Sequence, residues 1–337
     1  MTPLDALDRA VYFLDRAHEG GFKTKAFLRA RDVLRAIGPD EIAERAAAGT
    51  LVDLEGVGSA TARLVGEALT GADELPYLQK LDAETRIELS PEAAGYRAAL
   101  RGDLHLHTRW SDGSVDVEVM ARTAQALGHE YLVITDHSPR LTIAHGLNRE
   151  RLVQQLDEIA SVNERMGDFR VLAGMEVDIL EDGALDLDDD LLARLDIVVA
   201  SVHSKLAMER QKMTERMVLA VANPHVDILG HCTGRMIAKR EPSQFDADYV
   251  FAACARFHTA VEINCRPERL DPPRELLDLA LEYGCFVTVD TDAHSPGQLE
   301  WQPLGCEKAA ESGVPIERIL NTWSVDDLLE WAGGSGV

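Results

Sequence analysis

Between Arg101 and His294 the chain repeats one pattern seven times: a short run rich in Val, Ile and Leu is followed by a longer amphipathic segment. The runs are DLHLHT, YLVITDH, RVLAGMEVDI, LDIVVASVH, VDILGH, TAVEIN and CFVTVDTDAH. Strands that alternate with helices on this scale form a mostly parallel sheet. The pattern therefore predicts an α/β fold, a barrel with a missing or distorted unit, and an open doubly wound sheet is the alternative.

Residues 1–95 show a helical pattern instead. Apolar residues at positions 4, 7, 11 and 14 keep the spacing of one helix face, and a second apolar series follows in FKTKAFLRARDVLRAIG. The pair Gly38-Pro39 predicts a helix end, and residues 54–58 predict a tight turn between two short helices. We expect two domains, a small all-α domain over residues 1–95 and the barrel over residues 101–337.

Each of the seven runs ends in side chains that can bind a metal ion. They are His105 and His107, followed by Asp112; Asp136 and His137; Glu176 and Asp178; His203; His231; Glu262 and Asn264; and Asp290, Asp292 and His294. In parallel α/β folds the C-terminal strand ends form the functional face, and residues two apart on a strand point the same way. These groups should therefore converge on one cleft.

Imidazoles and carboxylates packed together without partners would repel each other or stay unsatisfied, and divalent cations solve that problem. A donor set of His, Asp and Glu without thiolate suits Zn²⁺, Mn²⁺ or Fe²⁺, and so many candidate ligands favour two or three ions over one. Closely spaced ions support hydrolysis of phosphate esters. An ordinary hydrogen-bonded polar residue is the alternative reading for any single histidine of the group.

Basic residues near the strand ends are candidates for holding phosphate oxygens, with ordinary surface charge as the alternative for each. They are Arg140, Lys205, Arg235, Arg266 and Arg269. Arg235 and Arg269 are favoured as phosphate stabilisers because each lies within a motif. A metal-bound hydroxide is the expected nucleophile, and no protein base is obviously required.

The composition limits the setting in which the chain works. A net charge of −24 argues against nonspecific binding of nucleic acid by the chain as a whole. We find no apolar run of about 18 residues that would span a membrane and no secretory signal in the opening MTPLDALDRAV. The five cysteines are scattered, as is typical of reduced thiols. We expect a cytoplasmic protein without a membrane partner, and the oligomeric state stays open.

The motifs and their order resemble a known family. DLHLHTRWSDG, ITDHS, GMEVDIL, ASVHS, GHCTGR, EIN and DTDAHS are similar to the PHP (polymerase and histidinol phosphatase) family along nearly all of residues 101–300. TDHSPRLTIAHGLNRERL and EINCRPERLD resemble the PHP domain of bacterial family X DNA polymerases in particular. The resemblance implies a distorted (β/α)7 barrel with a trinuclear metal centre and metal-dependent hydrolysis of phosphate esters.

The resemblance also implies which residues bind each ion. His105, His107, Glu176 and Asp292 would bind one ion, Glu176 would bridge to a second held by His203 and His231, and Asp112, His137 and His294 would hold the third. All nine positions carry a residue that can bind a metal. Cys232 stands where the family pattern has proline, which puts an oxidisable thiol next to the site.

The N-terminal part resembles the lyase-type domain of the same polymerases, because FKTKAFLRARDVL and LEGVGSATARLVGEAL are similar to its helix-hairpin-helix region. Gly56 and Gly58 would let backbone N–H groups approach a DNA phosphate at the start of the next helix, and a plain packing turn is the alternative. Further contacts to the DNA backbone are expected from Lys23, Lys25, Arg29, Arg31, Arg35 and Arg63.

Two departures from these polymerases matter. The helix after the hairpin has Arg63 but no lysine, so lyase activity through a Schiff base is not expected. The PHP-like part begins at Arg101, almost directly after the helical part, so no nucleotidyltransferase palm fits between them. The chain thus resembles a family X polymerase without its polymerase domain.

Three functions are consistent with these sequence features. The preferred hypothesis is a phosphoesterase acting on DNA, a 3′-end nuclease or phosphatase with a repair-type role, to which the helical domain delivers a DNA end. The alternative is a phosphatase for a small phosphomonoester such as histidinol phosphate, which the strong acidity of the chain favours. A non-enzymatic module with a lost site is the third, and the presence of all nine ligand positions argues against it.

Overall fold

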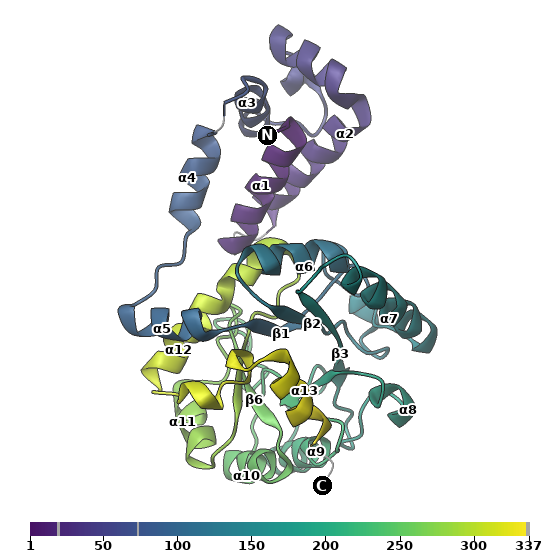
Figure 1. The fold of residues 1–337 in the computed structure, drawn as a ribbon, viewed down its shortest axis with the longest axis vertical. Helices are drawn as coiled ribbons and strands as arrows, with labels where there is room; N and C mark the ends of the chain where they lie inside the picture. Colours follow the sequence, from purple (N-terminus) through teal and green to yellow (C-terminus); the bar gives the residue numbers. More distant parts are fainter. Residues whose placement is uncertain (19–20, 73, 335–337) are drawn as a thin grey trace. The chain divides into compact units, whose positions relative to one another are not determined.

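The computed structural model describes residues 1–18, 21–72 and 74–334, and it divides the chain into two compact units (Figure 1). The first unit comprises residues 1–87 and the second comprises residues 88–337. In the part of the chain that the structure describes, no helix combines the length and the apolar character needed to cross a membrane.

The described residues of the N-terminal unit form helices and turns. The elements are α1 (Pro3–Arg16), α2 (Phe22–Ala48), the 3-10 helix η1 (Leu51–Asp53), α3 (Ser59–Leu69) and α4 (Pro76–Thr85). Gly38 leaves the helical region with a φ of 82°, so α2 is kinked at the Gly38-Pro39 pair, where the sequence predicts a break. Apolar residues at helical spacing form the core, among them Leu7, Leu14, Phe27, Leu34 and Leu64.

The predicted turn at residues 54–58 lies between η1 and α3. Gly56 has a φ of 97°, a conformation that favours glycine, and a Cβ there would lie 2.8 Å from the methylene groups of Arg29. The N–H of Gly58 donates a hydrogen bond to Thr61 Oγ1 at 3.0 Å. The turn is therefore tight, and one of the two N–H groups proposed for a phosphate already has a partner.

The C-terminal unit is a parallel barrel. Its seven strands pair in chain order: β1 (Gly102–Leu106), β2 (Tyr131–Ile134), β3 (Arg170–Asp178), β4 (Ile197–Ser201), β5 (Ile228–Leu229), β6 (Ala260–Asn264) and β7 (Val287–Asp290). The barrel closes beyond β7, where Leu106 bridges Ala293 and the N–H of His107 donates to the Ala293 carbonyl at 2.7 Å. The predicted distorted (β/α)7 barrel is confirmed, and the open sheet is not the architecture.

Each strand of the barrel is followed by a helix (Figure 1). The helices are α6 (Val117–Ala126), α7 (Arg149–Asn163), α8 (Asp189–Leu192), α9 (Arg210–Val221), α10 (Ala247–Phe257), α11 (Arg274–Glu282) and α12 (Gln302–Glu311), with 3-10 turns η2 (Thr142–Ala144) and η3 (Pro296–Trp301). The chain ends in η4 (Ile316–Arg318), η5 (Leu320–Thr322) and α13 (Val325–Gly333). Leu320 and Leu328 of this last segment pack with Leu104, Ile197 and Ile228 of the strands.

The helix before the barrel, α5 (Pro91–Ala99), packs on α12. Ser90 Oγ donates to the Glu307 carboxylate at 2.8 Å, and the hydroxyl of Tyr96 donates to the Val314 carbonyl at 2.8 Å. Residues 88–95, which the sequence interpretation assigns to the helical domain, therefore lie in the barrel unit. This leaves the segment before residue 88 as the separate helical unit.

Candidate metal centre

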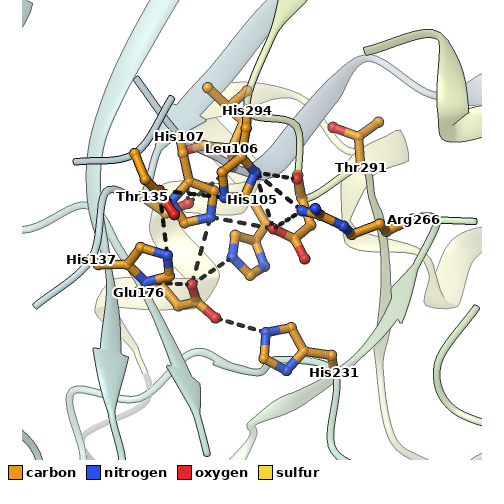
Figure 2. A network of polar contacts seen from close by, with 12 residues as sticks. His105, Leu106, His107, Thr135, His137, Glu176, His231, Arg266, Thr291 and His294 are labelled. Carbon is orange, nitrogen blue, oxygen red and sulfur yellow. Dashed lines mark hydrogen bonds and ion pairs between the residues drawn. The ribbon is translucent and has the colours of Figure 1, made fainter. Parts of the chain in front are cut away.

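Glu176, near the end of β3, lies at the centre of a cluster of imidazoles at the C-terminal ends of the strands (Figure 2). Its side chain is only 1 % exposed. Its backbone N–H donates to the carbonyls of Thr135 and Asp136, which fixes its position against the end of β2. Five imidazole nitrogens lie close to its carboxylate oxygens, those of His105 (3.3 Å), His107 (3.5 Å), His137 (2.9 Å), His203 (3.2 Å) and His231 (2.8 Å).

A second group of donors surrounds Asp112, in the loop after β1. Asp112 Oδ1 lies 3.4 Å from His294 Nε2, 3.6 Å from His137 Nε2 and 4.0 Å from His107 Nδ1. The Asp112 side chain is 35 % exposed, so this edge of the cluster faces solvent. A ligand could therefore reach the cluster from this side.

Asp292 brings a third carboxylate into the cluster just after β7. Its Oδ1 lies 3.4 Å from His107 Nε2, and its Oδ2 lies 3.3 Å from Arg269 Nε. The residue has a φ of 53°, a left-handed conformation that costs about 1–2 kcal/mol for most residues. A hydrogen bond from its N–H to the His105 carbonyl at 2.9 Å holds this conformation. Local strain of this kind is a feature of functional sites.

The structure brings all nine predicted ligands into one cluster. Donor atoms within 4.8 Å of one another form three overlapping groups: His107, Asp112, His137 and His294; His105, His107 and Asp292; and His137, Glu176 and His203. His231 joins them through its 2.8 Å contact with Glu176. The assignment of each residue to an individual ion stays a prediction.

Two further carboxylates orient the imidazoles from behind. Glu262 lies 2.6 Å from His105 Nδ1 and accepts a hydrogen bond from the backbone N–H of His231 at 2.5 Å. Asp178 lies 3.5 Å from His203 Nδ1 and accepts from the backbone N–H of that histidine at 3.1 Å. Such partners fix which ring nitrogen faces a metal. The sequence places both carboxylates at strand ends as possible metal ligands and predicts no supporting role for them, although their two-residue spacing from another strand-end group is a usable signal.

Asp136 supports the loop that carries Asp112. Its buried carboxylate accepts hydrogen bonds from Thr108, Ser111 and Gln155, including Thr108 Oγ1 at 2.6 Å and Gln155 Nε2 at 2.6 Å. Burial raises the pKa of Asp136, and the hydroxyls of Ser111 and Thr108 oppose that shift. Its oxygens are used for holding the loop, so it acts as a structural residue next to the cluster.

The carboxylates of the cluster are held in their charged form. Burial by itself raises the pKa of Glu176, but His203, His105 and His137 lower it more, so the pKa lies well below its usual range. The pKa of Asp292 is likewise well below its usual range, because its positively charged and hydrogen-bonding neighbours outweigh burial. The site therefore holds charged carboxylates in a buried environment, and this environment attracts cations.

The imidazoles differ in their readiness to lose a proton. Burial lowers the pKa of His107 to about 3, and its neighbours His294 and His137 act in the same direction. Burial also lowers the pKa of His203, but Glu176 outweighs this effect and raises it to about 9. A neutral imidazole has a lone pair available for a metal ion, so His107 is ready to coordinate at neutral pH.

The donor set fits a group of divalent ions. Buried ring nitrogens of the cluster without a hydrogen-bond partner include His105 Nε2, both nitrogens of His107, His137 Nδ1 and His231 Nδ1. A buried polar atom left without a partner costs about 1–3 kcal/mol. Metal ions would satisfy several of these atoms at once, and a mixed nitrogen and oxygen set suits Zn²⁺, Mn²⁺ or Fe²⁺.

A cavity of about 270 Å³ opens onto the cluster. Its carboxylates are Asp112, Glu176 and Asp292, all members of the cluster, and its cationic lining is Arg266 and Arg269. The rest of its wall includes the apolar side chains Leu141, Ile143, Ala144 and Met236. The cavity therefore combines a region for an anion with an apolar rim.

Comparison with known proteins assigns this site to a family. The PHP domain model matches residues 103–256. A probable phosphatase of Acetivibrio thermocellus is 33 % identical over 230 residues, which are 65 % of this chain and 90 % of that protein. The chain belongs to the PHP family. PHP proteins are metal-dependent phosphoesterases, so this chain is a hydrolase of that class.

Two further proteins are similar to the chain. The DNA polymerase/3′-5′ exonuclease PolX of Bacillus subtilis is 41 % identical over 229 residues, which cover 68 % of this chain and 40 % of the polymerase. The chain thus spans less than half the length of that relative. The histidinol phosphate phosphatase of Lactococcus lactis, solved with zinc, L-histidinol and phosphate, covers 69 % of this chain and 94 % of its own, with 18 % identity and a TM-score of 0.42.

The two favoured arginines of the PHP unit lie differently. Arg269 faces Asp292, its side chain is 14 % exposed, and its Nε and one terminal nitrogen are buried without a hydrogen-bond partner. Arg235 instead donates to the backbone carbonyls of Arg269, at 2.7 Å, and Leu270. Arg235 is therefore not brought to the cavity and serves to fix the loop that presents Arg269. Arg266, a weaker candidate from sequence, lines the cavity and lies 3.3 Å from His294 Nδ1.

Of the basic residues of the helical unit that are predicted to contact DNA, all but Arg31 are exposed; Arg31 is half-buried and pairs with Asp8 and Asp32. Lys23, Lys25 and Arg29 are exposed on the first turns of α2. Arg63 is exposed on α3, where its guanidinium lies 5.1 Å from the centre of the Tyr77 ring. These positions leave the basic side chains accessible, and their role in binding DNA stays a prediction.

Proposed function

We propose that this PHP protein hydrolyses phosphate esters at DNA 3′ ends, as a 3′-end nuclease or phosphatase, with three divalent ions (Zn²⁺, Mn²⁺ or Fe²⁺) bound in the cluster. The observation that carries the proposal is the set of five imidazoles around the one buried carboxylate of Glu176, at the end of a PHP barrel. A small phosphomonoester is the alternative substrate.

The nine side chains would divide among the three ions. One ion would be bound by His105, His107, Glu176 and Asp292, the second by Glu176, His203 and His231, and the third by Asp112, His137 and His294. The short distances from Glu176 to imidazoles on both of its oxygens support a bridging role for this residue. Glu262 and Asp178 would hold His105 and His203 in the orientation that binding needs.

The chemistry follows from this arrangement. Divalent ions bound there would lower the pKa of coordinated water and screen the charge of the phosphate. Arg269, with two buried nitrogens lacking hydrogen-bond partners, would bind a non-bridging phosphate oxygen, and Arg266 would do so beside it. Arg235 would keep the backbone of the Arg269 loop in place.

Three observations favour DNA as the substrate. The relative with 41 % identity is named a DNA polymerase and 3′-5′ exonuclease. The helical unit exposes Lys25 and Arg29 one turn apart on α2. The first backbone N–H groups of α3, at Ser59 and Ala60, lie at a helix start, where a phosphate oxygen would be stabilised. This unit would hold DNA as a helix-hairpin-helix domain.

Two observations favour the small phosphomonoester. The relatives named probable phosphatases match over most of their own length, 90 % for that of Acetivibrio thermocellus, so a PHP unit alone can make up such a protein. The net charge of −24 also opposes the approach of DNA. Bound divalent ions would reduce that opposition near the site.

A panel of substrates tests the proposal. Protein loaded with Mn²⁺ or Zn²⁺ would be assayed on an oligonucleotide with a 3′-hydroxyl, on one with a 3′-phosphate, and on histidinol phosphate. We expect turnover at the DNA 3′ end, its loss in Glu176→Gln, and its retention in Glu311→Gln, a matched change of an exposed glutamate on α12. Turnover of histidinol phosphate without any turnover of DNA would instead establish the alternative.

The role of the helical unit needs its own variant. Replacing Lys25 and Arg29 together by alanine should raise the KM for an oligonucleotide and leave kcat nearly unchanged, since the change removes contacts to the DNA backbone and not chemistry. The control is Lys80→Ala, an exposed lysine on α4. An unchanged KM in the double variant would refute delivery of DNA by these residues.

A further inference from the structure

The rim of the cavity carries an apolar side chain that the chemistry at the cluster does not use. Ile143, on η2, is 89 % exposed, the largest value among the exposed large apolar side chains in the described part of the barrel unit. It lines the cavity together with Leu141 and Ala144 of the same segment and with Met236 from the segment after β5. An exposed isoleucine elsewhere needs no explanation, but this one borders the cavity that leads to the cluster.

The loop that carries Ile143 is fixed to the metal centre. It starts directly after His137, and it closes where the N–H of Leu147 donates to the His137 carbonyl at 2.8 Å. At its base a Cβ on Gly146 would collide with the Ser138 carbonyl oxygen, so the two ends of the loop are in close contact. Ile143 is therefore held at a defined place relative to the cluster.

Further hydrogen bonds hold the loop in its conformation. The guanidinium of Arg151 donates to the carbonyls of His145 and Gly146, and the N–H of Arg140 donates to Asp186 at 2.5 Å. The neighbouring Ala144 is buried and anchors the turn. Because the loop has this support without Ile143, the exposed side chain is free to contact a ligand.

The cavity restricts what that ligand can be. Its cationic side, Arg266 and Arg269, suits a phosphate, and its three carboxylates all belong to the cluster. In the described lining no carboxylate remains for a cationic substrate such as an amino alcohol phosphate. A nucleotide fits better, because its phosphate would lie at the cluster while the apolar faces of its base meet the rim. Contacts to the face of a base tolerate any sequence.

We propose that Ile143 is a specificity-determining residue that packs against the base of the 3′-terminal nucleotide while the phosphate is at the cluster. The inference rests on the proposed function and adds that the base, and not only the phosphate, is recognised. Leu141 and Met236 would extend the same apolar surface.

The test compares two oligonucleotides that differ only in the 3′-terminal residue, which is a normal nucleotide in one and an abasic tetrahydrofuran residue in the other. We measure the ratio of kcat/KM for the two in the metal-loaded full chain. Ile143→Ser should lower the ratio about tenfold relative to the natural chain, by loss of apolar contact to the base. Ile143→Leu should retain the ratio, because it keeps an apolar side chain at the same place.

Ile316→Ser is the matched control, since Ile316 is an exposed isoleucine on η4 and does not line the cavity. Because Ile143 is exposed, its replacement does not open the core. An unchanged ratio in Ile143→Ser would overturn the role of Ile143 and leave the proposed function standing. Turnover of histidinol phosphate with no turnover of either oligonucleotide would overturn the proposed function as well.

Discussion

The short strand β5 lies between two buried carboxyl groups, those of Asp227 and Glu176, whose pKa values shift in opposite directions. At its N-terminal end Asp227 accepts one backbone hydrogen bond, from Val198 at 2.8 Å, and burial raises its pKa to about 8. Beyond its C-terminal end His231 meets Glu176, a carboxyl whose pKa lies well below its usual range. Both carboxyls are buried, so burial alone does not decide their charge.

The difference lies in the neighbours. Asp103 and Asp290 are buried beside the cluster, and burial raises the pKa of both; the charge of Asp290 adds to the shift of Asp103, and that of Glu262 adds to the shift of Asp290. Their partners include uncharged groups, such as Thr291 Oγ1 at 2.5 Å from Asp103 and Asn321 Nδ2 at 2.8 Å from Asp290. At the cluster, by contrast, imidazoles and arginines surround the buried carboxylates of Glu176 and Asp292. The carboxylates that imidazoles and arginines surround therefore mark the part of the barrel that can bind cations.

The largest effect is expected from the central carboxylate. Glu176→Gln removes a charge that five imidazoles surround, and with it the proposed bridge between two ions. Phosphoesterase activity should fall about 10³-fold or more, as loss of several kcal/mol of metal-assisted stabilisation implies. The measurement is kcat/KM with matched metal loading, and activity within tenfold of the natural chain would contradict the account.

Removal of the metal should affect stability next. At free ion concentrations of about 100–1,000 times the dissociation constant, ion binding stabilises the folded chain by about 3–4 kcal/mol per site. A chelator should therefore lower the Tm of the natural chain by several degrees and that of Glu176→Gln by less. Equal thermal shifts in both proteins would mean that the cluster does not bind the ions.

A smaller effect is expected from a supporting carboxylate. Glu262→Gln keeps an acceptor near His105 Nδ1 but loses the charge that strengthens this contact. We expect metal affinity to fall about 10-fold, the lower end of what such partners contribute. Titration with a competing fluorescent chelator measures it. Unchanged metal affinity would show that the charge of Glu262 does not contribute to metal binding.

The smallest effect concerns the other end of the barrel. The pKa of Asp227 is about 8 in the folded chain against about 3.8 for an ordinary aspartate, so the folded state holds its proton more tightly. The stability from this group is full below about pH 4 and is lost as the pH rises towards 8. Asp227→Asn cannot titrate, so the free energy of unfolding of this variant should rise relative to that of the natural chain by about 1 kcal/mol between pH 6 and pH 7.

Chemical unfolding at several pH values checks this prediction, with Asp168→Asn as the control at an exposed aspartate. A difference between Asp227→Asn and the natural chain that does not change with pH would show that Asp227 is charged when folded. In that case the buried carboxyls at both ends of the barrel would be charged.

Much of this arrangement could be predicted from the chain of residues, because strand ends are local features. The alternation of apolar runs and the His, Asp and Glu residues after them predict the barrel and a cluster of metal-binding side chains, and the resemblance to the PHP family selects the nine. The directions of long side chains could not be predicted. Arg235 lies in a motif like Arg269, yet it donates to backbone carbonyls, since its direction depends on a loop more than 30 residues away.

Other features depend on contacts that no local pattern reports. Glu262 reaches His105 across the barrel, over a separation of 157 residues. The N–H of Gly58 is used by Thr61, and the exposure of Ile143 follows from how its loop closes on His137. Residues 88–95 continue the helical pattern of the N-terminal part, whereas Ser90 and, just beyond them, Tyr96 donate to partners on and after α12.

The central claim is that the nine side chains at the C-terminal strand ends bind divalent ions. The most direct test is an anomalous difference map from crystals of the protein loaded with Mn²⁺ or Zn²⁺. The account predicts three peaks among the nine residues, with Glu176 within bonding distance of two of them. A map with no peak in this cluster, or with its only peaks elsewhere on the chain, would contradict it.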